Sequence, residues 1–94
     1  MLNITDIKVH DFHTGDIVQH FKREMIDGDK NTEYLYMIIG VAYHTETKEK
    51  LIIYRALYGE NKIYARPYDM FMSEVDHDKY PNIKQQYRFE LYEG

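Results

Sequence analysis

The strongest pattern along the chain is a pair of apolar stretches, residues 34–44 and residues 51–58. Both are rich in β-branched and aromatic residues and contain no proline, which favours β-strands. Alternate side chains of a strand face opposite sides, and in residues 34–44 both rows are largely apolar, so this strand is predicted to be central. Gly40 lies mid-strand, where glycine usually marks a bulge or bend. The polar residues 45–50 predict the loop of an antiparallel hairpin.

A third strand is predicted over residues 63–66, after a tight turn that contains glycine and asparagine. Pro67 ends this strand, because proline cannot donate to a ladder and restricts the residue before it. Residues 68–71 then suit a single 3₁₀ or α-helical turn, since proline is well placed before one. Met70 and Phe71 are expected to plug the end of a small barrel.

The rest of the chain supplies shorter elements. Residues 17–23 predict the first core strand, residues 72–75 a short strand and residues 85–91 the last strand. Residues 1–14 match neither a helical stripe nor strict alternation and are interpreted as an N-terminal extension. The 94 residues therefore predict one domain, with a mainly β core over residues 15–92.

Several short motifs occur in a fixed order along the chain. They are Gln19-His20-Phe21-Lys22, Gly40-Val41-Ala42, His44-Thr45-Glu46-Thr47, Tyr54-Arg55-Ala56-Leu57-Tyr58-Gly59, Arg66-Pro67 and Met70-Phe71. With these motifs the chain resembles the bacterial domain-of-unknown-function family 1653 over residues 15–91. The resemblance implies an SH3-like, partly open barrel of five or six antiparallel strands, and it implies no activity. The chain departs from the family pattern at Arg23 and at a longer acidic insert, residues 24–33, whose role stays open.

Composition narrows the classes of function. Cysteine is absent, which excludes a disulfide framework, a thiol nucleophile and a cysteine-ligated metal site. A net charge of −4 argues against general nucleic-acid binding, which depends on lysine and arginine. The chain shows no signal-peptide pattern and no apolar run approaching ~20 residues, so we expect a cytoplasmic protein without a membrane span.

Tyrosine and arginine together form the main candidate for a binding face. Ten of the fourteen aromatic residues are tyrosines, more than a small core needs. The candidate residues lie on adjacent predicted strands and are Tyr54, Arg55, Tyr58, Tyr64 and Arg66. Guanidinium groups between aromatic rings can bind a carboxylate, a phosphate or a nucleobase. The alternative is structural: the arginines pair with nearby acids, and the rings pair across strands.

A second candidate lies where the central strand enters its loop. His44 and Glu46 could act as ligand-binding residues or, together with His20, as the acid–base groups of an enzyme or metal-dependent hydrolase. The structural alternative is that Thr45 and Thr47 bond the turn backbone. No nucleophile motif and no zinc motif accompany these residues, so the sequence predicts no catalytic residue, no metal and no cofactor.

The function that these patterns favour is a non-catalytic binding module that uses a Tyr/Arg-rich face. Its partner would be an unknown protein or a small anionic ligand. A small enzyme built on the histidines is one alternative. Self-association through edge strands, which expose unpaired backbone groups, is another.

Overall fold

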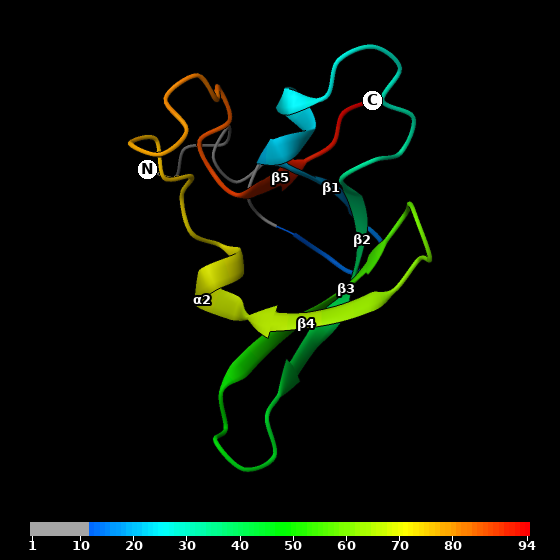
Figure 1. The fold of residues 1–94 in the computed structure, drawn as a ribbon. Helices are drawn as coiled ribbons and strands as arrows, with labels where there is room; N and C mark the ends of the chain where they lie inside the picture. Colours follow the sequence, from blue (N-terminus) through cyan, green and yellow to red (C-terminus); the bar gives the residue numbers. More distant parts are fainter. Residues whose placement is uncertain (1–11) are drawn as a thin grey trace, which may run out of the picture.

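The computed structural model describes residues 12–94 and shows one antiparallel sheet that curls around a core without closing into a barrel (Figure 1). Its five strands are β1 (Ile17–His20), β2 (Leu35–Tyr43), β3 (Lys50–Ala56), β4 (Ile63–Pro67) and β5 (Phe89–Leu91). They lie in the order β4-β3-β2-β1-β5, so β4 and β5 form the two edges. The predicted mainly β fold is confirmed. The prediction of an N-terminal extension concerns mainly residues 1–11, which lie outside the described residues.

Two short helices interrupt the strands. The 3₁₀ helix η1 (Phe21–Met25) begins where we expected the first strand to continue to residue 23. That expectation was wrong because the Lys22 amide donates a hydrogen bond to His20 Nδ1 at 3.0 Å, and this capping bond turns the backbone. The predicted turn after Pro67 is confirmed as α2 (Tyr68–Phe71). Within residues 12–94, no helix has the length and apolar character needed to span a membrane.

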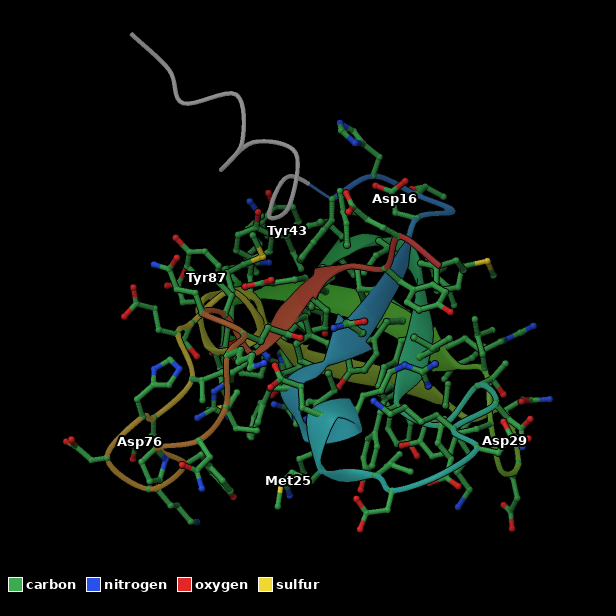
Figure 2. All side chains as sticks on the ribbon, turned by 90° about the horizontal axis from the view of Figure 1, so that it is seen from above. Asp16, Met25, Asp29, Tyr43, Asp76 and Tyr87 are labelled. Atoms are coloured by element: carbon green, nitrogen blue, oxygen red, sulfur yellow. The ribbon has the colours of Figure 1, made fainter. Side chains whose placement is uncertain are left out.

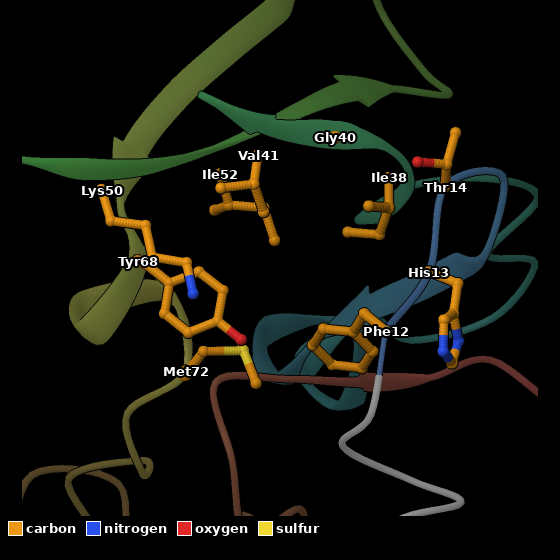
Figure 3. Close-up of a pocket in the computed structure, with 10 residues that line it drawn as sticks. All are labelled: Phe12, His13, Thr14, Ile38, Gly40, Val41, Lys50, Ile52, Tyr68 and Met72. Carbon is orange, nitrogen blue, oxygen red and sulfur yellow. The ribbon is translucent and has the colours of Figure 1, made fainter. Parts of the chain in front are cut away.

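A β-bulge in β2 changes which residues face the core. The register with β3 shifts between Ile38 and Gly40, as the mid-strand glycine predicted. Beyond the bulge, Val41 pairs with Ile52, and Figure 3 shows both pointing into the same pocket as Ile38. Strict alternation had placed Ile38 and Val41 on opposite faces. That assignment was wrong, because the extra residue of a bulge reverses the parity of the strand.

The core lies inside the curl of the sheet and is dominated by aromatic rings. Phe71 of α2 and Phe89 of β5 stack at a centroid distance of 3.9 Å, and both are almost fully buried. The other buried members come from β1, β2 and β3 and are Val18, Tyr36, Ile38, Ile52, Tyr54 and Ala56. Met70 is half exposed, so Phe71 alone plugs the end that we expected both residues to fill.

The segment between α2 and β5 has little regular structure and is held by side chains. The short strand expected over residues 72–75 is a single bridge between Glu74 and Tyr87. Gln85 is 5% exposed, and its amide nitrogen donates to Gln19 O at 3.0 Å and to Tyr87 O at 2.9 Å. Gln19 Nε2 donates in return to Gln85 Oε1 at 2.8 Å. This glutamine pair ties the segment to β1.

The acidic insert is anchored by the residue at which the chain departs from the family pattern. The Arg23 guanidinium donates to the carbonyl oxygens of Glu33, at 2.7 Å, and of Asn31, at 3.1 Å. It also lies 5.3 Å from the centre of the Tyr92 ring. In Figure 2, Met25, at the end of η1, lies between the insert, marked by Asp29, and the loop that carries Asp76.

Candidate functional site

The edges β4 and β5 do not pair, and Arg66 lies across the open seam between them. From β4 its guanidinium carbon reaches to 5.9 Å from the centre of the Phe89 ring of β5. Arg66 also lies beside the Tyr54 hydroxyl. Burial raises the pKa of Tyr54, and the charge of Arg66 and a hydrogen bond from it offset part of that rise. The seam is therefore spanned by the side chain of a cation, and no strand pairing closes it.

Behind Arg66 lies a pocket of about 290 Å³, which we call the cationic pocket. Its lining comes from β1, η1, β4 and residues 76–88, and consists of His20, Phe21, Lys22, Arg66, Asp76, Lys79, Tyr80 and Arg88. Four lysine or arginine side chains thus face one carboxylate, in a protein whose net charge is −4. A local positive potential results, which favours an anion.

The cations of this pocket pair with no carboxylate in the described part of the chain. Within residues 12–94 the ion pairs are Lys62 with Glu60 and His13 with Asp16, both outside the pocket. The nearest acids are occupied by backbone amides. Asp76 Oδ1 accepts from the amide of residue 78 at 3.1 Å and from that of residue 79 at 3.3 Å. Glu24 accepts from the amides of residues 84 and 85 at 2.9 and 2.8 Å.

Arg88 has a buried hydrogen-bond donor that is not satisfied by the described residues. Its Nε is buried, yet this N–H has no hydrogen-bond acceptor within the part of the chain that the structure describes. A buried donor without an acceptor is unfavourable, and native proteins rarely retain one. An anion in the cationic pocket would lie next to this arginine.

Burial and the positive charges of the cationic pocket both lower the pKa of His20. Burial lowers the pKa of His20 to about 4, and the charges of Lys22, Arg66 and Arg88 contribute to the decrease. The ring is therefore neutral near pH 7. Since Nδ1 accepts the Lys22 amide hydrogen, the proton of the neutral ring sits on Nε2. The ring also stacks on Phe21 at a centroid distance of 4.4 Å.

Tyrosines continue the lining of the concave face from the cationic pocket. The Tyr36 and Tyr58 hydroxyls lie 2.6 Å apart, and burial raises the pKa of Tyr36. The Tyr64 ring lies 5.7 Å from that of Tyr54, and Tyr64 is 44% exposed. Tyr58 is partly exposed, whereas Tyr54 is buried at 4%. Tyr58, Tyr64 and Arg66 are thus accessible together, and Tyr54 supports them from beneath.

Arg55 does not join this group. It follows Tyr54 on β3 and pairs with Met37 and Ile63, so its side chain projects from the opposite face of the sheet. It is exposed there. The structure therefore separates the two arginines that the sequence placed together.

His44 and Glu46 lie in the loop between β2 and β3, at the opposite end of the molecule from η1 (Figure 1). His20 Nδ1 is at the η1 end, so the three proposed acid–base groups do not converge. The expectation of a hydrolase site built from them was wrong, because nine residues of extended β2 separate the two histidines.

The loop matches the structural alternative in part: the Thr47 hydroxyl bonds the turn backbone, whereas no such bond of the Thr45 hydroxyl occurs among the described residues. His44 Nδ1 accepts from the amides of Glu46 and Thr47 at 3.1 and 3.2 Å. Thr47 Oγ1 accepts from the amide of residue 49 at 3.2 Å. Among residues 12–94, no three His, Cys, Asp or Glu side chains are arranged to hold a metal ion.

A second pocket, of about 270 Å³, opens on the other side of α2 and is mainly apolar (Figure 3). Ile38, Val41 and Ile52 point into it from the sheet, and Phe12 and Met72 close the opposite side. Its one lysine, Lys50, is engaged with the Tyr68 ring, whose centre lies 3.9 Å from Nζ. This pocket is lined by one lysine, whereas four lysine or arginine side chains line the cationic pocket, which is therefore the stronger candidate for an anion.

Sequence reasoning missed Lys22, Lys79 and Arg88. These residues are spread over 66 positions and follow no motif spacing. The signal that could have found them is indirect: Lys22 follows His20-Phe21, and Arg88 precedes the apolar Phe89, both next to buried rings. Only the pairing of β1 with β5 brings them together.

Comparison with known proteins agrees with the resemblance noted from the motifs. The model of a family described as "Protein of unknown function (DUF1653)" matches residues 16–91, most of the chain. No curated protein and no solved structure matches significantly.

Proposed function

We propose that this chain, which belongs to the DUF1653 family of proteins of unknown function, is a non-catalytic module that binds a small anionic ligand at the open seam. The observation that carries the proposal is that Arg66 lies across the seam, without a carboxylate partner among residues 12–94, and shares one face of β4 with Tyr64, which is 44% exposed. Arginine next to aromatic surface can pair with an anion and stack on a flat group.

A titration followed by proton–nitrogen NMR tests this function. The labelled protein is titrated at low ionic strength with acetate, succinate, phosphate and an acidic dipeptide, because salt screens charge pairs. We expect shifts at Tyr58, Tyr64 and Arg66, and we expect Arg66→Met to weaken them. Arg55→Met is the matched control, since it removes the same charge from the opposite face. Shifts confined to the loop around His44, or no shifts with any anion, would contradict the proposal.

Self-association is a second candidate, favoured by the free edge of β4. Ile63 on this strand is 54% exposed, and the outer backbone groups of an edge strand can pair with another chain. Sedimentation velocity at high protein concentration tests it. A dimer that Ile63→Lys dissociates would support this candidate, and a monomer would exclude it.

A further inference from the structure

We infer that the cationic pocket takes the phosphate group of a phosphate monoester. This inference rests on the proposed function and specifies the chemistry of its ligand. The groups that carry it are the side chains of Lys22, Arg66 and Arg88, with His20 beside them.

The number of cationic donors that line the pocket favours phosphate over carboxylate. A carboxylate has two oxygens and one charge, and a single arginine matches it in a bidentate pair. A phosphate monoester has three acceptor oxygens and a charge of about −1.5 to −2 near pH 7. The two arginines and Lys22 reach the pocket from β4, from the residue before β5 and from η1. A three-oxygen anion can pair with all of them at once.

Two nitrogen donors of the pocket lining, Arg88 Nε and His20 Nε2, make no hydrogen bond to the described residues. The buried Nε of Arg88 has no acceptor in the described chain. His20 uses Nδ1 to accept the Lys22 amide hydrogen, which leaves its Nε2–H as a neutral donor on the pocket lining. Meanwhile Asp76 Oδ1 accepts from amides of its own loop, and among residues 12–94 its carboxylate forms no ion pair with a pocket cation, so one negative charge faces four positive ones.

The aromatic wall of the pocket favours an ester over free phosphate. The Tyr80 ring contacts the Phe21 ring edge-on, with centroids 4.9 Å apart, and both residues line the pocket beside the cations. Phe21 is only 5% exposed, so the partly exposed Tyr80 ring supplies the surface against which the organic part of an ester would pack and which a free phosphate ion would leave uncovered. A nucleoside monophosphate and a phosphorylated side chain share this chemistry.

Isothermal titration calorimetry at pH 7.5 tests the inference with four probes: phosphoserine, adenosine monophosphate, inorganic phosphate and succinate. We expect at least one ester to bind about tenfold more tightly than succinate, and Arg88→Met to lower that ester's affinity by about tenfold or more. Whether the better ester is the nucleotide or the amino acid identifies the source of the phosphate. Arg55→Met, on the opposite face, is expected to leave the affinity unchanged.

The outcomes separate the ligand class from the proposed function. If succinate binds as tightly as either ester, the phosphate inference is overturned while anion binding at the seam stands. If the esters bind and Arg88→Met has no effect, the cationic pocket is not their site. If Arg88→Met fails to fold by its NMR spectrum, Lys22→Met replaces it, because Lys22 is partly exposed and its side chain makes no hydrogen bond among the described residues. An unchanged affinity in Lys22→Met then overturns the inference as well.

Discussion

The protonation of His20 should make the folded state unstable in acid in a way that one substitution removes. Folding lowers the pKa of His20 from 6.5 to about 4, mainly through burial and then through the charges of Lys22, Arg66 and Arg88. Between these two values the unfolded chain binds a proton that the folded chain does not. Stability is therefore lost as the pH falls from about 6.5 to about 4.

The size of the effect follows from the same two pKa values. A pKa difference of about 2.5 corresponds to ~3 kcal/mol, at 1.36 kcal/mol per unit. His20 is only partly buried, so screening by solvent reduces this value, and we expect ~2 kcal/mol. His20→Asn removes the titrating group while its side-chain oxygen can still accept the Lys22 amide hydrogen.

Urea denaturation of wild type and His20→Asn at pH 4 and pH 7 measures the effect. The variant also loses ring packing on Phe21, but this loss is the same at every pH. We expect the stability advantage of the wild type to shrink by ~2 kcal/mol on going from pH 7 to pH 4. Carboxylates titrate in both proteins and cancel. An advantage that does not change with pH, together with a His20 NMR titration near 6.5, would refute the reasoning.

Two more predictions concern the residues that position the site. Gln85→Met should cost about 1–3 kcal/mol of stability in urea denaturation, because it leaves carbonyl oxygens such as Gln19 O without their donor. The control is Gln86→Met, a change at the exposed neighbouring residue. Equal losses of stability in the two variants would contradict the role of Gln85. Gly40→Ala should leave thermal stability unchanged or raise it by about 0.4–1 kcal/mol, since among the described residues an added Cβ meets only Thr14 Oγ1, at 4.0 Å, and an alanine restricts the unfolded chain. A clear loss of stability would show that the bulge needs glycine.

Local residue choice determined most of the fold. The β-branched and aromatic residues of the apolar stretches 34–44 and 51–58 favour strands, and the short loop between the stretches pairs them in sequence order. Pro67 specifies both the end of β4 and the start of α2, because its ring removes a donor and sets φ. Gly40 correctly marked the bulge. These features depend on neighbours in the sequence, so the sequence alone was sufficient to predict them.

Tertiary structure decided which of the candidate residues are accessible on the same face. Alternation along β3 and β4 already puts Arg55 on the other face from Tyr54, but only the register between the strands shows that Tyr64 and Arg66 share the concave face with Tyr54. The bulge then reverses the parity of β2 beyond Ile38. Register is a long-range property, so a one-dimensional pattern could not supply it.

The cationic pocket was decided entirely by tertiary structure. Lys22, Arg66 and Arg88 are far apart in the chain, and each alone is an ordinary charged residue. They converge because β5 pairs with β1 and because the sheet curls until β4 faces β5 across the seam. Their charges form no ion pair within residues 12–94, where the carboxylates of Glu24 and Asp76 accept from backbone amides. The sequence by itself indicated the central strands and the helical turn after Pro67, and the packing of the two sheet edges decided where an anion could bind.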